Sequence, residues 1–189
     1  SGGVILAYNS ANSLIATDTV FSIENIIGTS NNDTIVGGTG SINTLQGGAG
    51  DDVLRGNLDG DSLIGGSNID TLACGNVIDD LTVDMSQKSI FKTSSPSEKD
   101  NFSTIEVIQT GSGDDVFTLS GSSDSTSLTL DGGAGRNTVD YGSLSIGNVV
   151  VSLADSGNST VTVNSGTGND IITNINNISG SQNGDRILG

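Results

Sequence analysis

Aspartate and asparagine recur along residues 28–81 at near-constant spacing, and an aliphatic residue follows each of them two positions later. The six pairs are Asp33/Ile35, Asn43/Leu45, Asp52/Leu54, Asp61/Leu63, Asp70/Leu72 and Asp79/Leu81. The steps between pairs are ten, nine, nine, nine and nine residues. Glycines precede most of these polar residues, which is typical of turns. Carboxylates and exposed backbone carbonyls are the ligands that calcium prefers, so the spacing predicts a row of calcium sites.

The most regular copy is Gly47-Gly48-Ala49-Gly50-Asp51-Asp52-Val53-Leu54-Arg55. It matches the pattern G-G-x-G-x-D-x-U-x at every specified position, where U is a large aliphatic residue. Neighbouring copies are less complete, since residues 37–43 carry an insertion, residues 65–70 lack the third glycine and residues 74–79 keep one glycine. Five consecutive steps nevertheless keep the register. On these residues the chain resembles the RTX, or hemolysin-type calcium-binding, repeat family.

The resemblance implies an all-β fold, a right-handed parallel β-solenoid known as a calcium β-roll. In that family a repeat forms a six-residue turn and a three-residue strand, so two repeats complete one coil and residues eighteen apart stack. One edge of the coil would carry Asp33, one residue out of step, with Asp52 and Asp70; the other would carry Asn43, Asp61 and Asp79. Rungs lie about 4.8 Å apart, and carboxylates about 5 Å apart repel by roughly 3 kcal/mol at an effective dielectric near 20. A bridging cation relieves this repulsion, and the resemblance implies several Ca²⁺ ions.

The candidate metal ligands share a position in or beside such a turn. The side-chain candidates are Asp33, Asn43, Asp52, Asp61, Asp70, Asp79, Asp115, Asp170 and Asp185. Gly48 and Gly50 are candidates through their carbonyls, because glycine tolerates positive φ and exposes the backbone. Metal-free turns of a solenoid would use the same residue types, so that alternative stays open.

A longer repeat encloses the nonapeptides. The segments Ile23-Glu24-Asn25-Ile26, Ile105-Glu106-Val107-Ile108 and Ile175-Asn176-Asn177-Ile178 each begin ten residues before an aspartate. We therefore expect longer, β-helix-like rungs between the nonapeptide blocks. The expected organisation is a first unit over 1–85, a loop excursion over 86–103, a second unit over 104–150 and a third over 151–189.

Two details of this organisation remain to be decided. The third unit ends within a repeat, which favours a piece of a longer chain. Residues 148–163 alternate with period two on either side of a turn, and they fit either a hairpin or two successive rungs.

Composition restricts the function classes. The 189 residues include 28 glycines and 3% aromatics, so the core must stack small and aliphatic side chains. The net charge of −16 argues against nucleic acid as a partner, and no apolar stretch approaches the length of a membrane span. The lone Cys74 cannot form an intrachain disulfide and is expected to be a buried filler. The chain has no histidine, which excludes imidazole-based triads and His-ligated zinc.

These observations predict a calcium-binding structural or adhesive segment of a secreted or cell-surface protein. It would act as a spacer, an adhesin stalk, or a building block of a surface layer or filament. The resemblance implies type I secretion, and a self-associating copy or a cell-surface glycan or protein is the expected partner. No enzymatic activity is expected. The alternative is the non-catalytic β-roll portion of a secreted protease, lipase or epimerase.

Overall fold

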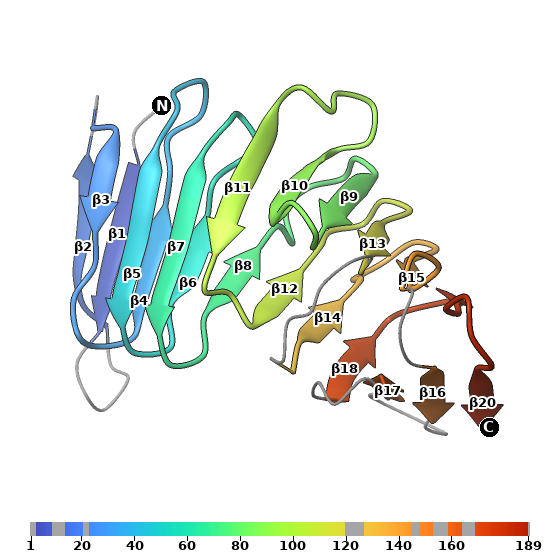
Figure 1. Ribbon diagram of the computed structural model, residues 1–189. Helices are drawn as coiled ribbons and strands as arrows, with labels where there is room; N and C mark the ends of the chain where they lie inside the picture. Colours follow the sequence, from blue (N-terminus) through green and yellow to red (C-terminus); the bar gives the residue numbers. More distant parts are fainter. Residues whose placement is uncertain are drawn as a thin grey trace. The chain divides into compact units, whose positions relative to one another are not determined.

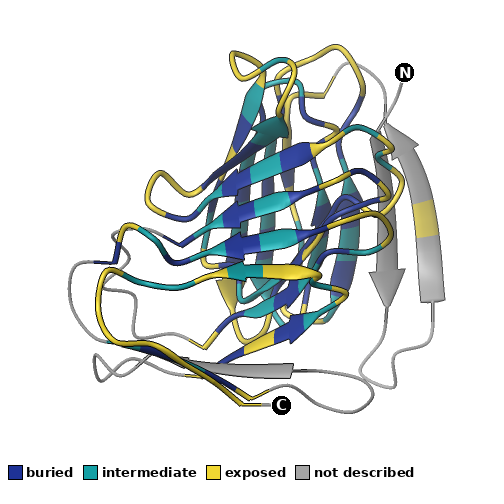
Figure 2. Cartoon of the chain, turned by 90° about the vertical axis from the view of Figure 1, so that its right-hand side faces the viewer, coloured by how far each residue is buried: buried dark blue, intermediate teal, exposed yellow. Residues whose placement is uncertain are grey.

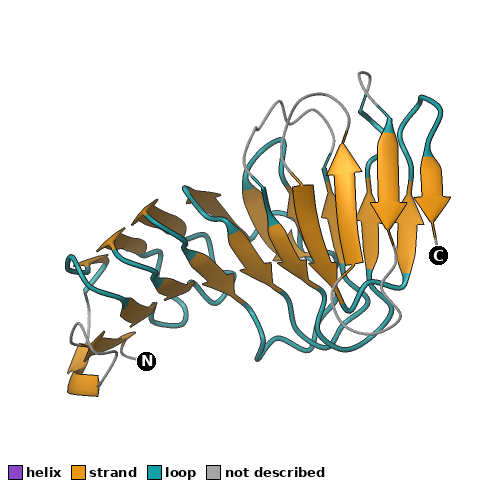
Figure 3. Cartoon of the chain, turned by 90° about the horizontal axis from the view of Figure 1, so that it is seen from below, coloured by secondary structure: helices purple, strands orange, loops and turns teal. Residues whose placement is uncertain are grey.

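The computed structural model describes residues 3–8, 14–20, 23–119, 127–144, 148–152, 159–163 and 169–188. Every regular element in these ranges is a β-strand (Figure 3). The chain forms two compact units. Unit 1 comprises Ser1–Cys74 and Ser89–Val107, and unit 2 comprises Gly75–Lys88 and Ile108–Gly189. In the part of the chain described, no helix is both long and apolar enough to cross a membrane.

Unit 1 contains strands of two sheets, and from β3 to β8 the chain alternates between them (Figure 1). On one side lie, in order, β2 (Leu14–Val20), β1 (Gly3–Tyr8), β4 (Asp33–Val36), β6 (Val53–Arg55) and β8 (Thr71–Ala73). On the other lie β10 (Ser89–Lys92), β11 (Lys99–Ser103), β7 (Ser62–Ser67), β5 (Thr44–Ala49) and β3 (Asn25–Ile27). The repeat strands pair in parallel within each sheet. The predicted all-β parallel solenoid is therefore confirmed.

The pairing register follows the repeat. Thr44 lies opposite Ser62, and Val53 lies opposite Thr71, so one coil spans eighteen residues. Because side chains alternate between the faces of a strand, this register directs the aliphatic residue of every repeat to the interior. The resulting core consists of Ile35, Leu45, Leu54, Leu63 and Leu72, each 0% exposed. Figure 2 shows this alternation of buried and partly exposed positions along the strands.

Residues 86–103 differ from the predicted loop excursion. Strands β10 and β11 form an antiparallel pair in which Ile90 faces Asp100, and β11 then pairs in parallel with β7. Phe102 lies opposite Leu63 and is buried, so the segment rejoins the coil of unit 1. Asp100-Asn101-Phe102 repeats the order of acidic residue, spacer and large apolar residue, with an aromatic where the repeats have an aliphatic side chain. The sequence pattern did not reveal this similarity, because the surrounding residues are rich in lysine and serine.

Unit 2 uses longer steps. One group of strands contains β12 (Val107–Gln109), β14 (Thr129–Asp131), β18 (Asn169–Thr173), β17 (Ser159–Val163), β16 (Val149–Ser152) and β20 (Arg186–Leu188). The other contains β19 (Asn177–Ser179), β15 (Thr138–Asp140), β13 (Val116–Thr118) and β9 (Leu81–Asp84). Val83, Phe117 and Val139 occupy successive rungs and are 0% exposed. Since β16 and β17 pair antiparallel, the hairpin alternative holds for these two strands; the turn expected between them lies outside the described residues.

Several turn glycines of unit 1 lie where a Cβ would collide with the backbone of a neighbouring coil. Gly66 has a φ of 125°, and a Cβ added there would collide with the backbone oxygen of Gly48 and lie 2.9 Å from its carbonyl carbon. Gly75, in contrast, has open space where a Cβ would lie. Cys74 is buried, as expected of a filler residue.

We predict that Gly66→Ala lowers the free energy of unfolding by about 1–3 kcal/mol from backbone strain alone. The matched variant Gly75→Ala should leave stability unchanged or raise it by about 0.4–1 kcal/mol, because its backbone accepts alanine. Urea denaturation in excess calcium measures both. Equal losses in the two variants would contradict the close approach of coils at Gly66.

Candidate metal centre

The first row of acidic side chains runs along one edge of unit 1. The backbone N–H of Asp33 donates to Asp52 Oδ1 at 2.8 Å, and the N–H of Asp52 donates to Asp70 Oδ1 at 2.9 Å. The three side chains are at most 2% exposed. The predicted stack of Asp33, Asp52 and Asp70 is therefore present in the structure. It continues to Glu106, whose Oε2 accepts a hydrogen bond from the N–H of Asp70 at 2.9 Å.

The second row lies on the opposite edge of the same unit. The N–H of Asn43 donates to Asp61 Oδ1 at 2.6 Å, and the N–H of Asp61 donates to Asp100 Oδ1 at 2.8 Å. Asp79 was predicted to follow Asp61, and this placement is wrong. The chain leaves the coil after β8 and rejoins it at β11, so Asp100 takes the next place while Asp79 belongs to unit 2.

Each row leaves carboxylate oxygens without partners. Asp33 Oδ1, Asp52 Oδ2, Asp61 Oδ2 and Asp70 Oδ2 are buried and accept no hydrogen bond from any described residue. An ionised carboxylate oxygen buried without a partner costs several kcal/mol, so a proton or a cation must neutralise it. These orphaned oxygens distinguish the rows from ordinary polar turns, whose side chains satisfy their own backbone.

Backbone carbonyls lie beside the orphaned oxygens. A Cβ added to Gly47 would touch Asp52 Oδ2 and lie 2.6 Å from the carbonyl oxygen of Gly65. One coil further, a Cβ on Gly65 would touch the carbonyl oxygen of Thr104 and lie 2.5 Å from Asp70 Oδ2. The space beside each bare glycine thus brings together a carboxylate oxygen and a carbonyl oxygen. This mixed oxygen set is the kind that Ca²⁺ binds, so the residues fit the ion.

Gly48 and Gly50 have φ values of 114° and 109°, as their predicted role in the turn requires. A Cβ on Gly48 would collide with the carbonyl oxygen of Thr29, and one on Gly50 would lie 2.6 Å from the carbonyl carbon of Asn31. Glycine therefore allows the coils to approach closely at these positions. Whether their own carbonyls bind the ion stays a prediction.

Burial and like charge act together on the carboxyl groups. Burial, with Asp70, Asp33 and Asp51 nearby, raises the pKa of Asp52 to about 6. Burial, with Asp100 and Asp59 nearby, raises the pKa of Asp61 to about 7. The pKa of Asp70 is also raised, first by burial and then by the charge of Glu106. Protons and cations therefore compete for the same oxygens near neutral pH.

An outer, exposed row accompanies the first one. Asn32 Oδ1 accepts a hydrogen bond from the N–H of Asp51 at 2.9 Å, and Asp51 Oδ1 accepts one from the N–H of Ile69 at 3.1 Å. Asp51, the additional carboxylate beside Asp52, therefore caps the backbone of the next coil at the surface. The repeat pattern alone did not predict this role.

The corresponding row of unit 2 consists mainly of amides. The N–H of Asp115 donates to Asn137 Oδ1 at 3.0 Å, and the N–H of Asn137 donates to Asn176 Oδ1 at 2.7 Å. The Nδ2 group of Asn137 donates to the carbonyl oxygens of Ala134 and Asn174 at 3.3 and 2.9 Å. An amide N–H thus occupies carbonyls that a cation would otherwise bind. In this row Asp115 alone keeps a buried oxygen without a partner, and burial raises its pKa.

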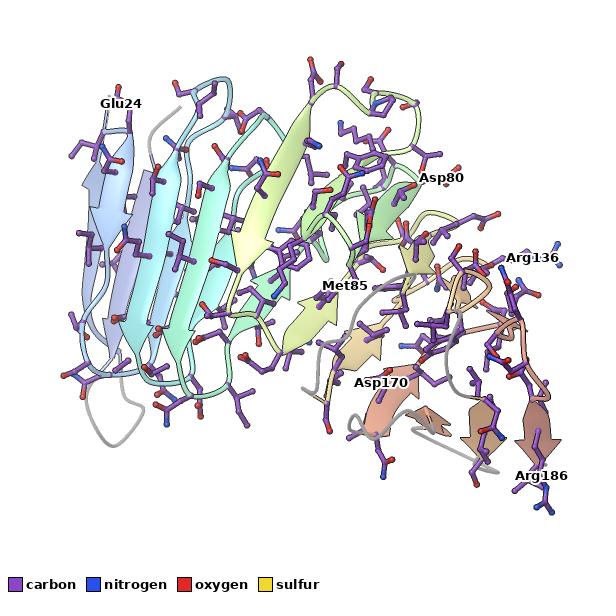
Figure 4. All side chains as sticks on the ribbon, viewed as in Figure 1. Glu24, Asp80, Met85, Arg136, Asp170 and Arg186 are labelled. Atoms are coloured by element: carbon purple, nitrogen blue, oxygen red, sulfur yellow. The ribbon has the colours of Figure 1, made fainter. Side chains whose placement is uncertain are left out.

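Asp170 accepts hydrogen bonds from protein groups at both carboxylate oxygens, whereas the bonds of Asp185 go to Oδ1. Asp170, on β18 and labelled in Figure 4, accepts hydrogen bonds from the N–H of Leu128 and the hydroxyl of Tyr141, both at 3.1 Å. Asp185 is exposed and accepts hydrogen bonds from the N–H of Val149 at 2.8 Å and from Ser181 Oγ at 2.7 Å. The Val149 bond lowers the pKa of Asp185. Their role as metal ligands stays a prediction; the glycines at 166 and 168 lie outside the described residues.

Comparison with known families agrees with this geometry. Residues 23–41 and 38–72 match the family described as RTX calcium-binding nonapeptide repeat (4 copies). The matched residues include Asp33, Asn43, Asp52, Asp61 and Asp70, which make up most of both rows in unit 1. No curated protein matches the chain. Residues 23–72 thus carry RTX calcium-binding repeats within a parallel β-solenoid, as the sequence predicted.

We predict that the stability in EDTA falls as the pH rises, whereas the stabilisation added by calcium grows. Since the pKa values of Asp52 (about 6) and Asp61 (about 7) lie above the unfolded value of about 3.9, the folded chain binds more protons than the unfolded chain between these limits. In EDTA this contribution to stability is complete below about pH 4 and is lost as the pH rises to about 7. The stabilisation added by calcium should grow over the same window, because the ion requires ionised carboxylates.

Thermal unfolding between pH 4.5 and 7.5 measures both trends. The variant with Asp52→Asn and Asp61→Asn serves as the control, because it lacks the two titrating groups and should show a flatter profile in EDTA. If calcium added equal stability at every pH, the buried carboxylates would not be its ligands.

A second prediction concerns Tyr141 and Asp170. Tyr141→Phe removes the hydroxyl donor from a buried carboxylate, so we expect a loss of about 1–3 kcal/mol in the free energy of unfolding. The loss should be the same in calcium and in EDTA, because the hydroxyl and not an ion satisfies Asp170. Denaturant unfolding under both conditions measures it. If calcium restored the free energy of unfolding of the variant, Asp170 would be able to bind the ion.

Proposed function

We propose that this chain is a calcium-stiffened structural or adhesive segment of a secreted or cell-surface protein. The observation that carries the proposal is the pair of acidic rows in unit 1, whose buried oxygens lack partners and lie beside backbone carbonyls. RTX repeat proteins are typically secreted by type I systems, which supports an extracellular location. The proposal assigns no catalytic role to these residues.

The chain's own residues prepare the sites. In the first row Asp33, Asp52 and Asp70 would hold ions together with carbonyl oxygens such as that of Gly65. The backbone N–H of the preceding coil binds one oxygen of Asp52 and of Asp70 and so directs the other toward the glycine turn. In the second row Asp61 is oriented in the same way by the N–H of Asn43. Bound calcium would supply the positive charge that lets these carboxylates stack.

Stacking depends on the fold, because the three aspartates of the first row lie eighteen or nineteen residues apart in sequence. The unfolded chain has no such sites, so calcium binding and folding should be coupled. Extracellular calcium modules have dissociation constants of about 10⁻⁴–10⁻³ M. A chain of this kind would be only weakly stable at low calcium and become rigid where calcium is abundant. That property suits a spacer or stalk.

The proposal is tested by neutralising the first row. Asp52→Asn with Asp70→Asn keeps an acceptor for the backbone amides but removes two charges. We expect the calcium concentration at half-folding to rise by roughly tenfold or more, equivalent to at least about 1.4 kcal/mol. In EDTA the same variant should be more stable than the wild type, because it buries fewer charges. Circular dichroism during calcium titration measures both effects.

Asp114→Asn is the matched control. Asp114 is exposed and accepts a hydrogen bond from the N–H of Arg136 at 2.8 Å, which an asparagine can retain. Its calcium requirement should equal that of the wild type. A wild-type β signal that is identical in calcium and in EDTA would contradict coupled folding and, with it, the proposed function.

A further inference from the structure

A cluster of three carboxylates lies at the point where the hairpin β10–β11 meets the repeat coil. One carboxylate oxygen each from Asp59, Asp61 and Asp100 lies within 4.8 Å of the others. Asp61 and Asp100 are 0% and 1% exposed, and Asp59 is half-buried. Asp59 and Asp61 belong to the repeats, while Asp100 comes from β11 and lies outside the residues that match the nonapeptide family. All three belong to unit 1.

Unpartnered buried oxygens face this cluster. Asp61 Oδ2 and Asp59 Oδ1 are both buried and accept no hydrogen bond from any described residue. A Cβ added to Gly56 would touch Asp100 Oδ2 and lie 2.9 Å from Asp61 Oδ2. The oxygens of Asp61 and Asp100 therefore converge on the space beside the bare Cα of Gly56. A fully buried carboxylate with an orphaned oxygen aimed at a second buried carboxylate requires a positive charge between them.

The backbone holds Asp100 in this orientation. Its Oδ1 accepts hydrogen bonds from the N–H groups of Gly60 and Asp61 at 3.1 and 2.8 Å, and its Oδ2 accepts one from the N–H of Leu58 at 3.1 Å. The turn that presents these donors has positive φ at two non-glycine residues, Asn57 (85°) and Leu58 (63°). Such strain persists where the surrounding structure enforces it. Here the turn wraps the Asp100 carboxylate.

The sequence of this turn departs from the nonapeptide pattern. In the regular copy, Gly50 lies two residues before Asp52; in this copy Asp59 lies two residues before Asp61. An acidic side chain thus replaces the third glycine of the repeat. Asp59 Oδ2 accepts a hydrogen bond from the N–H of Gly40, and its Oδ1 remains without a partner. The replacement adds a third carboxylate at the one turn that also receives Asp100.

We propose that Asp59, Asp61 and Asp100 bind a calcium ion that fastens the hairpin β10–β11 to the repeat coil. The ligand set contains only oxygen and carries three formal negative charges, which favours a hard divalent cation over zinc or copper. The site rests on the proposed calcium function and extends it beyond the nonapeptide repeats. It makes the hairpin, which the repeat pattern does not encode, part of the calcium-dependent structure.

The test measures the number of bound calcium ions and the hydrogen–deuterium exchange of the hairpin. Wild-type protein, Asp59→Asn and Asp100→Asn are titrated with calcium chloride, and bound ions are counted by native mass spectrometry and calorimetry. Each variant should bind one ion fewer than the wild type. Hydrogen–deuterium exchange of residues 89–103 should slow on addition of calcium in the wild type but not in the variants.

Two controls separate the possible outcomes. Glu98→Gln removes one charge from an exposed position of the same hairpin and should behave as the wild type. Asp100→Asn also loses an acceptor for the N–H of Leu58. If this variant fails to fold, the result for Asp59→Asn is decisive, because Asp59→Asn leaves the Asp100 hydrogen bonds in place. Full stoichiometry and calcium-slowed exchange in Asp59→Asn would overturn this site and leave the proposed function standing. If the wild type bound no calcium at all, the proposed function would fail as well.

Discussion

The hydrogen bond between a backbone N–H and the acidic side chain of the next coil is the interaction on which unit 1 depends. It joins Asp33 to Asp52, and Asp52 to Asp70, at 2.8 and 2.9 Å. This bond sets the register of the coils and satisfies one carboxylate oxygen, but it leaves the other oxygen buried. The glycine turns follow from it, since only a bare Cα leaves room beside that oxygen. The aliphatic core follows as well, because the same register stacks Leu54 on Leu72.

The two units satisfy the buried oxygens of their rows by different means. In unit 1 the rows consist mainly of aspartates, whose unpartnered oxygens require a proton or a cation. In unit 2, Asn137 presents an amide N–H to two carbonyl oxygens, and the Tyr141 hydroxyl satisfies Asp170. A neutral donor replaces the ion and avoids the repulsion between stacked charges. We therefore expect unit 1 to account for most of the calcium dependence of the chain, with Asp115 as the principal candidate in unit 2.

Residues outside the nonapeptides complete both rows of unit 1. Asp100 follows Asp61 in the second row, and Glu106 follows Asp70 in the first. Asp100 lies on β11, the second strand of the hairpin, and Glu106 follows that strand. The repeat can therefore be interrupted while both acidic rows stay continuous. This requires that the segment that rejoins the coil places an acidic side chain at the level of the next rung.

The sequence by itself determined the nonapeptide period. Together with the resemblance to RTX repeats, it also predicted the eighteen-residue coil, the stacking of Asp52 on Asp70 and the aliphatic core, because these depend on local turns and on a strict repeat. It also indicated which oxygen-rich turns suit calcium. Only the tertiary structure decided where the chain rejoins the coil, and hence that Asp100 and not Asp79 follows Asp61. It likewise decided that Tyr141, 29 residues away in sequence, satisfies Asp170. Such contacts join segments at irregular separations, and a carboxylate's need for an ion depends on which donors the fold brings to its second oxygen.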